Sequence, residues 1–441
     1  MSASWNRKPG VLPHVPPEIW QRILEMATLV PGSLDPDIED PFDCSEPRRW
    51  RNRITKPGIR DEQEDIRDSL ITKRYVVRVC KQWYTLGMPL LYQSIFVGRE
   101  RMFATLLETL RRSQNDIVVG DDNHHSHPLG WWTRRLDFRL RDSPHNVSLG
   151  EMTVKVIDEI FSLLTNLSIF VLAHPPSRGE YYTAPYSIAV SLFERCGSTL
   201  QMLSWGTSFR FEVGYDYAHL TAEILSKTPA LRTVHGDFPV MMDTRAPIGS
   251  ARHLTSLITF SQLPELVPSP DNTITFPALQ QFYFIAELAR DWHPSRAPFM
   301  ATLGANLTTL YIRYSSMSNV YSPLSSFSSE YYPRLVHLII ICSNWTRLEG
   351  LRIPPQMTHL GLLCEMSQNS DAVYEEVFMV LRQVMTPPTP SLRIVRFLNP
   401  RGTNDLRDRH RKVLLRGLRW LALHDLRVED HEGRDMRDLL G

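Results

Sequence analysis

Residues 333–342 read PRLVHLIIIC, and the pattern of this stretch decides the fold that the sequence predicts. A proline precedes Leu335, and Leu338 and Ile340 complete a phrase of the form Leu-x-x-Leu-x-apolar. A short apolar run that begins just after a turn is typical of a buried strand. The stretch therefore predicts a turn and then a strand whose alternate side chains point into a core.

The same phrase recurs along the chain between residues 132 and 397. From Leu167 onward, the first apolar positions of successive copies lie 22 to 35 residues apart. This spacing is an irregular version of the leucine-rich-repeat period. The other copies are WTRRLDF (132–138), LTNLSIFVL (164–172), STLQMLSW (198–205), PALRTVHG (229–236), RHLTSLITF (252–260), PALQQFYF (277–284), ANLTTLYI (305–312), PQMTHLGLL (355–363) and PSLRIVRF (390–397).

Amphipathic segments separate several copies, so each unit is predicted to be a helix, a turn and a strand. These segments are residues 151–164, 187–195, 218–227 and 371–385. Such a unit cannot bury its own apolar face, and stacking of neighbours must complete the core. The same leucines could instead come from unrelated helices of one globular domain, but the runs FYF, LIII and LGLL favour strands.

We therefore expect the α/β class, with a small N-terminal helical module followed by an irregular leucine-rich-repeat solenoid, horseshoe-like in shape. The expected solenoid covers residues 131–426. Residues 405–426 would form one capping helix, and residues 427–441 a polar tail.

Composition narrows the class of protein further. The chain has 441 residues, 42% apolar and 22% charged, which suffices for a sizeable core and excludes global disorder. A net charge of +1 lacks the basic surplus that nucleic-acid-binding proteins usually carry. The cysteines are scattered, and the sequence shows no signal peptide and no long apolar run. These features predict an intracellular protein, cytoplasmic or nuclear, without a membrane partner.

The N-terminal region combines a helical pattern with a charged segment. VPPEIWQRILEMATL, residues 15–29, predicts an amphipathic helix whose first turn holds Pro17. Residues 31–47 contain six acids and four prolines, and residues 48–60 are basic. Blocks of like charge commonly mark disordered segments. We expect residues 33–60 to be a mobile loop that contributes little to stability, inside a polar insertion at about residues 31–73.

A second helical pattern begins near Tyr75 and would place Val76, Val79, Cys80, Trp83 and Leu86 on one face. On an apolar helical face Cys80 would be a small core residue, not a nucleophile. Gly87 and Pro89 are expected to break this helix, and a short apolar helix or strand would follow through Leu90, Leu91, Ile95 and Phe96.

The two N-terminal patterns together resemble the F-box family. Its Leu-Pro-x-Glu start and first helix are matched by Val15, Pro16, Pro17, Glu18, Ile19, Ile23 and Leu24. Its Val-Cys-Lys-x-Trp phrase is matched by Val79, Cys80, Lys81, Gln82 and Trp83. The stretch Met88 to Val97 is similar to the closing helix and exit strand of fungal members. The sequence departs from the family in Val15, which replaces leucine, and in the insertion between the two halves.

The resemblance implies a non-catalytic, substrate-recognition subunit of a Skp–cullin–F-box ubiquitin ligase. Its partners would be a Skp-type adaptor, through it a cullin, and an unknown protein substrate. Residues 12–97 would be the F-box-like module, and residues 98–130 a helical linker and polar loop. The adaptor-binding residues would be Val15, Pro16, Pro17, Glu18, Ile19, Ile23, Leu24, Val79, Cys80, Lys81 and Trp83.

Strand alternation predicts which repeat residues line the inner side of a curved sheet, the surface that solenoids commonly use for binding. They are Arg135, Asp137, Arg139, His235, Asp237, Tyr283, Tyr311, Arg313, His337, His359 and Arg396. The candidate substrate-binding residues among them are Tyr283, Tyr311, Arg313, His337, His359 and Arg396. The first three are favoured because they fall on adjacent repeats and because Tyr and Arg are enriched at binding hot spots. Most other residues of the face are expected to be simply solvated.

Two other classes of function stay open. One is a leucine-rich scaffold whose N-terminal helices only cap the solenoid, and the weaker one is an enzyme whose residues converge only in three dimensions. The sequence has no P-loop, dinucleotide-binding or nucleophile-elbow motif. His124, His125 and His127 lack companion ligands at zinc spacing, so no metal or cofactor is expected.

Overall fold

The structure is a computed structural model that describes most of the chain. The described residues are 15–38, 40–42, 60–118, 127–139, 151–172, 182–184, 186–205, 209–211, 226–236, 252–259, 276–286, 303–314, 332–342, 345, 353–364, 370–385 and 391–438.

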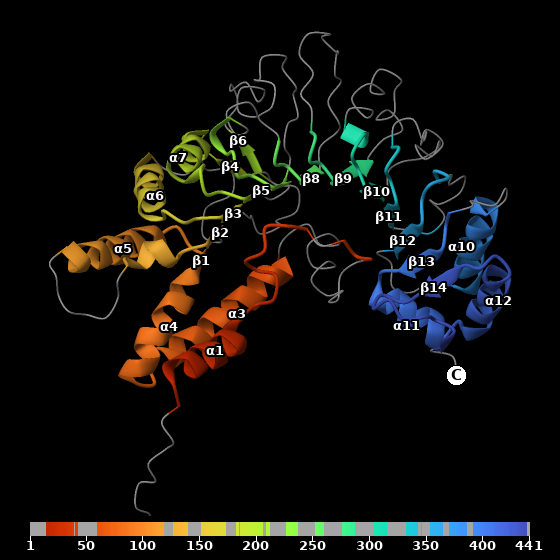
Figure 1. The fold of residues 1–441 in the computed structure, drawn as a ribbon, viewed down its shortest axis with the longest axis horizontal. Coiled ribbons are helices and arrows are strands. Elements are labelled where there is room, and N and C mark those ends of the chain that lie inside the picture. The colour runs from red at the N-terminus through yellow and green to blue at the C-terminus, as the bar shows by residue number, and fades with distance from the viewer. Residues whose placement is uncertain are drawn as a thin grey trace, which may run out of the picture.

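One sheet of twelve parallel strands forms the frame of the protein, and its strands trace an arc with an inner and an outer side (Figure 1). Its strands are β1 (Ser94–Val97), β2 (Arg135–Phe138), β3 (Ile169–Leu172), β5 (Met202–Trp205), β7 (Thr233–His235), β8 (Ser256–Thr259), β9 (Gln281–Ala286), β10 (Thr309–Tyr314), β11 (His337–Cys342), β12 (His359–Cys364), β13 (Ile394–Phe397) and β14 (Arg427–Glu429), in that order across the sheet. A separate parallel pair joins β4 (Tyr182–Ala184) to β6 (Phe209–Phe211).

All ten copies of the leucine phrase coincide with strands of this sheet, from β2 to β13. The register pairs equivalent positions of successive copies, so that Leu338 lies beside both Leu310 and Leu360. Equivalent apolar side chains therefore stack from strand to strand and share one core. The predicted α/β class is confirmed at this level.

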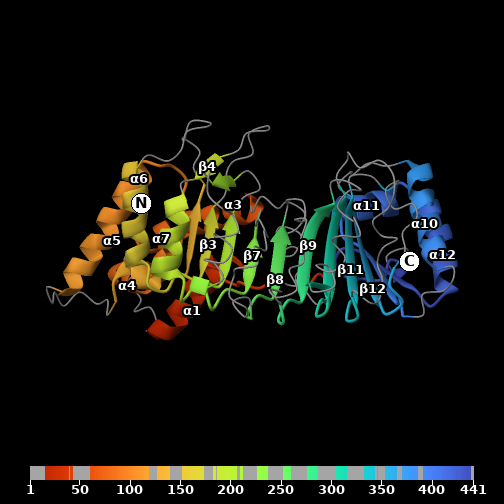
Figure 2. The same cartoon turned by 90° about the horizontal axis from the view of Figure 1, so that it is seen from above.

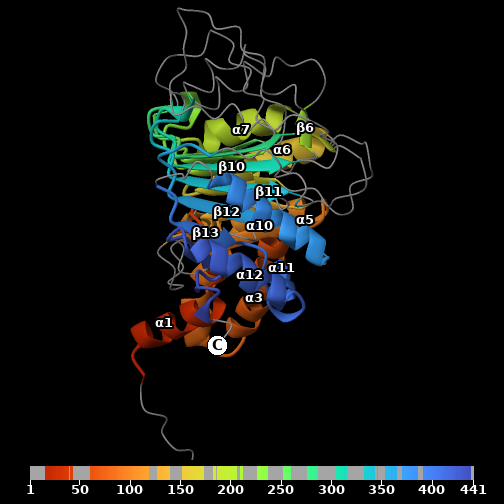
Figure 3. The ribbon, with the colours of Figure 1, turned by 90° about the vertical axis from the view of Figure 1, so that its right-hand side faces the viewer.

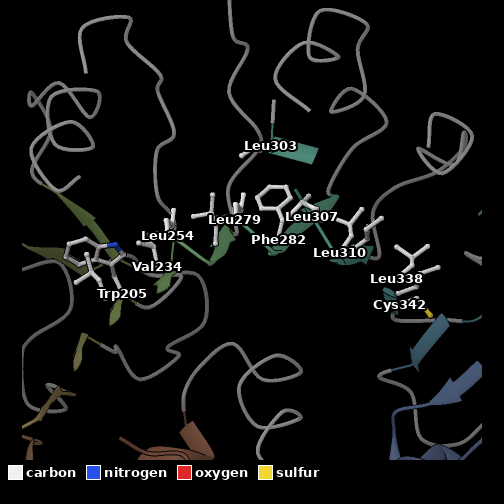
Figure 4. Packing of buried hydrophobic residues seen from close by; sticks show 14 of the residues in the cluster. Trp205, Val234, Leu254, Leu279, Phe282, Leu303, Leu307, Leu310, Leu338 and Cys342 are labelled. Atoms are coloured by element: carbon white, nitrogen blue, oxygen red, sulfur yellow. The ribbon is translucent and has the colours of Figure 1, made fainter. Parts of the chain in front are cut away.

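Alternation along the strands divides the buried side chains between the two sides of the sheet. Leu338 and Cys342 point to the outer side and belong to the largest apolar cluster (Figure 4). Three helices cover the outer side toward one end of the arc, namely α5 (Met102–Val118), α6 (Glu151–Leu163) and α7 (Tyr186–Cys196) (Figures 1 and 2). Near the other end, Phe378 of α10 (Asp371–Val384) packs against Phe397. Ile339 and Ile341 face the inner side.

Three N-terminal helices pack together below the sheet, at the end of the arc that carries β1 (Figures 1 and 3). They are α1 (Pro17–Thr28), α3 (Arg60–Val76) and α4 (Lys81–Gln93). The rings of Trp20 on α1 and Trp83 on α4 lie 5.1 Å apart between centroids. Because β1 begins at Ser94, directly after α4, the helical module is joined to the sheet without an intervening loop.

Helix α3 corrects the expectation of a polar insertion that lasts until about residue 73. Its first turns are rich in acids, and Lys73 and Arg74 lie in its last turn. This distribution of charge stabilises a helix because acids favour the positive end of the macrodipole and bases the negative end. Ile66 is buried, so the helix is also part of a packed unit.

The C-terminal region also differs from the predicted single capping helix and polar tail. Two helices, α11 (Pro400–Asp408) and α12 (Arg411–Ala422), are followed by the last strand of the sheet, β14. Val428 and Met436 are buried in the main core, which gives residues 427–436 a structural role. Across all described residues, no helix is long and apolar enough to cross a membrane.

Candidate functional site

The first candidate surface is an exposed apolar stripe on α1. Ile19, Ile23, Met26 and Leu29 are each between 45% and 70% exposed. The spacing of three or four residues places Ile19, Ile23 and Met26 on one face of the helix, and Leu29 follows as its C-cap. The opposite face buries Leu24 inside the helical module. The stripe therefore exposes to solvent apolar side chains of the kind that usually fill a core.

Most of the residues predicted to bind an adaptor are exposed, but three of them are not. Exposed members of the predicted set are Pro16, Pro17, Glu18, Ile19, Ile23, Val79, Cys80 and Lys81. Val15 and Trp83 are half-buried, and Leu24 is buried. Leu24 therefore supports the stripe from within the module, whereas Met26 and Leu29 extend the stripe and were not in the predicted set.

Cys80 is an exposed helix cap, which corrects its predicted place on a buried helical face. Helix α3 ends at Val76, and Cys80 has an extended backbone with φ −161° and ψ 170°. Its Sγ accepts the backbone N–H of Trp83 at 3.4 Å, so it caps the start of α4. The predicted helix from about Tyr75 is therefore interrupted by a turn before Cys80, and α4 then continues through Gly87 and Pro89, where a break was predicted.

The second candidate surface is the inner side of the sheet, and a segment of the chain itself crosses it. We name residues 33–42 the strap; the structure describes all of them except residue 39. Figure 1 shows the strap, near the red end of the colour range, running between the N-terminal helices and the far end of the arc.

The strap begins at a buried charged cluster on β2. The Arg135 guanidinium donates to the Ser33 carbonyl oxygen and to a carboxylate oxygen of Glu62, each at 2.7 Å. It also forms a paired contact with Asp137, at 2.7 and 3.1 Å. Because Glu62 lies on α3, this one guanidinium joins the sheet, the strap and the helical module.

The middle of the strap is anchored by Ile38 and its neighbour Asp37. Ile38 is buried in an apolar cluster of the inner side, and the Gln281 side-chain amide donates to its carbonyl oxygen at 2.8 Å. Asp37 forms an ion pair with Arg232 at 2.8 Å. The other members of the apolar cluster are Tyr283, Tyr311, Ile339, Ile341, Leu363 and Leu398, with Phe42 packed against it.

Asp40 places a carboxylate between two adjacent strands. Its Oδ2 lies 2.6 Å from Nδ1 of His337 on β11 and accepts the hydroxyl of Thr309 on β10. Its Oδ1 accepts the Phe42 backbone N–H at 2.9 Å. Burial alone would raise the pKa of Asp40, but these hydrogen bonds and the charge of His337 outweigh it and hold the pKa below its ordinary value.

Phe42 completes the strap in a site made of two imidazoles and a guanidinium. Its ring centroid lies 4.9 Å from that of His337 and 4.7 Å from that of His359. The Arg396 guanidinium carbon lies 5.1 Å from the ring centroid, and its NH1 donates to the Pro41 carbonyl oxygen. At Gly361 a Cβ would lie 3.4 Å from Phe42 and only 2.8 Å from Leu398, so glycine leaves the space that these side chains fill.

The curvature of the sheet allows one short segment to reach both ends. The strap contacts Arg135 on β2 and Arg396 on β13, which are nine strand spacings apart. Nine spacings of about 4.8 Å would measure roughly 43 Å in a flat sheet. The chain from Ser33 to Pro41 spans at most about 29 Å when fully extended. The strap crosses the arc as a chord (Figure 1), and the side chains of Arg135 and Arg396 span the rest of the distance.

These contacts correct two expectations. Residues 33–60 were expected to form a mobile loop, but the described residues 33–38 and 40–42 pack against the sheet. They do so because Ile38 and Phe42 are apolar anchors among the acids. The inner side is also largely covered instead of solvated. Arg135, Asp137, Arg139, His235, Tyr283, Tyr311 and Arg396 are buried, Arg313, His337 and His359 are half-buried, and Asp237 lies outside the described residues.

The predicted substrate-binding residues are thus brought together by the structure, but against the strap. Tyr283 and Tyr311 are each 1% exposed, with ring centroids 6.2 Å apart. His337, His359 and Arg396 form the Phe42 site. Residues of the strap itself were absent from the predicted set, although an isoleucine and a phenylalanine within an acidic run were a usable signal.

Metal binding finds no support among the side chains that can be placed. Within the described ranges, no group of three or more His, Cys, Asp or Glu residues could hold a metal ion. His127 stacks on Trp131 with 3.9 Å between ring centroids, and His124 and His125 lie outside the described residues.

No protein-family model matches the sequence, and no curated protein matches it.

Proposed function

We propose that this protein is the substrate-recognition subunit of a Skp–cullin–F-box ubiquitin ligase. In this role it is non-catalytic. Helices α1, α3 and α4 bind a Skp-type adaptor and, through it, a cullin, while an irregular leucine-rich-repeat solenoid built on the parallel sheet presents a protein substrate. Such a subunit acts in the cytoplasm or the nucleus.

The exposed stripe of α1 is the observation that carries the proposal. Ile19, Ile23, Met26 and Leu29 would gain free energy by leaving water, at roughly 25 cal/mol for each Å² of apolar surface buried. An apolar stripe on one face of a helix is the pattern by which helices bind in grooves of partner proteins. The exposed turn at Pro16 and the exposed Val79 lie in the two halves of the F-box-like pattern, which also supports this use of the module.

The connection between the module and the sheet supports the second half of the proposal. A ligase subunit must hold its substrate at a defined position relative to the adaptor. Here α4 continues directly into β1, and Arg135 joins α3 to β2 through Glu62. These two connections would keep the adaptor-binding helices and the inner side of the sheet in a constant arrangement.

Substitution of the stripe tests the proposal. We expect Ile19→Asp combined with Ile23→Asp to abolish formation of a complex with a coexpressed Skp-type adaptor, measured by size-exclusion chromatography. The matched control is Met152→Asp with Met379→Asp, which changes two apolar residues on α6 and α10 that are more exposed than Ile19 and Ile23. The control should bind like the wild type, and circular dichroism should show that both variants are folded.

Two results would count against the proposal. Adaptor binding that survives the stripe substitutions would show that α1 is not the docking helix. Failure of the folded wild-type protein to bind the adaptor would favour the scaffold alternative, in which the N-terminal helices only cap the sheet.

A further inference from the structure

The strap is held in the way that a bound peptide is held. Among its described residues, none belongs to a strand, so the sheet does not extend to include it. Its contacts are made by inner-side groups of the sheet: Gln281 and Arg396 bond its carbonyl oxygens, and His337 and Thr309 bond its carboxylate. A separate peptide of similar sequence could form each of these contacts.

The anchors of the strap follow a simple spacing. Ile38, Asp40 and Phe42 are two residues apart, and the side chains of all three contact the inner side of the sheet. Ile38 enters the apolar cluster, Asp40 reaches His337, and Phe42 packs on His337 and His359. The inner side therefore has three adjacent subsites, one aliphatic, one for a carboxylate and one aromatic.

Charge complementarity indicates which peptides fit. The strap contributes Asp37 and Asp40, and the groups that meet them are Arg232, His337 and the Thr309 hydroxyl. Arg396 lies beside the aromatic subsite, where it is also paired with Glu429 at 2.6 Å. A basic peptide would lose these contacts, because like charges in a partly buried site repel one another.

We propose that the strap is an intramolecular occupant of a peptide-binding surface, and that the protein's substrate is an acidic peptide of the form aliphatic-x-Asp-x-aromatic, which replaces the strap on the inner side. The inference rests on the proposed function in calling this partner a substrate. The strap contacts by themselves support the surface and its preference for acidic peptides.

Tethering explains why such a surface can be occupied in the free protein. A segment of the same chain acts at an effective concentration in the millimolar range, so it competes strongly with a separate peptide. Weakening the strap without changing the sheet should therefore expose the surface. The same weakening should raise the affinity for a peptide added from outside.

A direct binding measurement tests the inference on the full-length protein. The probe is a fluorescein-labelled synthetic peptide of residues 32–43, GSLDPDIEDPFD. We expect the variant Asp40→Ala with Phe42→Ala to bind it at least tenfold more tightly than the wild type, by fluorescence anisotropy. Adding His337→Ala to that variant should remove the gain, because it destroys the carboxylate and aromatic subsites. A control peptide with alanine at the positions of Asp40 and Phe42 should not bind.

Folding and adaptor binding are measured in parallel. If circular dichroism shows that the double variant is unfolded, Asp40→Asn replaces it, since the amide keeps the shape and removes the charge; about a threefold tighter binding is then expected. A folded variant that binds the peptide no better than the wild type would overturn the inference, as would a gain that survives His337→Ala. Complex formation with the adaptor through α1 is measured on the same samples, so its loss would bear on the proposed function and not on the peptide surface.

Discussion

The carboxylate of Asp40 shows how much one residue can change the role of a segment. In sequence it is one of several acids in a run with four prolines. In the structure it lies between β10 and β11, bonded to His337 and Thr309. Desolvation of an unpaired carboxylate would oppose this placement, and the surrounding donors compensate for it.

Lys73 gives a prediction at the same scale. It is buried, and burial lowers the pKa of its ammonium group from 10.5 to about 8. A pKa lowered in the folded state means that folding disfavours the charged form. The destabilisation is therefore complete below about pH 8 and disappears as the pH rises toward 10.5, where the unfolded chain also loses the proton.

We expect Lys73→Met to raise the free energy of unfolding at pH 7 by up to about 3 kcal/mol, because the charge is removed and the apolar stem is kept. Thermal unfolding at pH 7 and at pH 10.5 measures the effect. The exposed Lys81→Met serves as the control and should change stability little at either pH. An equal gain for Lys73→Met at both values would contradict an electrostatic origin.

The individual elements show which helix and strand boundaries a local sequence pattern can predict and which it cannot. The start of α1 follows from Pro17 and the apolar spacing after it, and the strands follow from the leucine phrase. The boundary between α3 and α4 does not, because the apolar spacing runs through Val79 and Cys80 without interruption. The turn between these helices is marked by a cap that uses a thiol, an uncommon acceptor at this position.

This cap leads to a prediction for the element scale. The Cys80 Sγ to Trp83 N distance of 3.4 Å is that of a weak sulfur acceptor. Serine is a preferred N-cap residue, so Cys80→Ser should raise the free energy of unfolding by about 0.5–1 kcal/mol. Cys80→Ala should lower it, since the N–H loses its acceptor. Chemical denaturation of the wild type and the two variants measures these differences. Identical stabilities of Cys80→Ser and Cys80→Ala would mean that the cap does not stabilise α4.

At the scale of the whole molecule, Arg135 links three parts of the fold. It is fully buried and pairs with Asp137 of the sheet, Glu62 of α3 and the carbonyl of Ser33 in the strap. Burial opposes its charge, but the two carboxylates outweigh this and raise its pKa. Removing one partner of a buried ionic group leaves the others uncompensated, which is strongly destabilising.

We therefore expect Arg135→Met to lower the free energy of unfolding by about 3–5 kcal/mol. Limited proteolysis should also cut more readily near the strap and the start of α3 than in the wild type. The neighbouring Arg134 is exposed, and Arg134→Met is the matched control, with an expected change within about 0.5 kcal/mol. If both variants behaved alike, the cluster would not be what holds the helical module to the sheet.

The sequence by itself determined the strands, because each one depends on residues a few positions apart. The turn, the leucine and the alternating apolar side chains in PRLVHLIIIC are sufficient to make a buried strand wherever the phrase recurs. The same local reasoning selected the residues of the inner side, since alternation places Tyr283, Tyr311 and His337 opposite the core. The start of α1 likewise follows from Pro17 and the helical spacing after it, whereas the exposure of Ile23 and Met26 depends on how α1 packs in the helical module.

Only the tertiary structure decided what lies on that inner side. Ile38 bonds Gln281 at a separation of 243 residues, Asp40 meets His337 at 297, and Pro41 meets Arg396 at 355. No local sequence pattern predicts contacts between residues so far apart in the chain. A run of acids with prolines has, by itself, the composition of a solvated loop. The strap acquires its structure because the curved sheet brings β2 and β13 within reach of one short segment and presents an apolar cluster and positive groups between them.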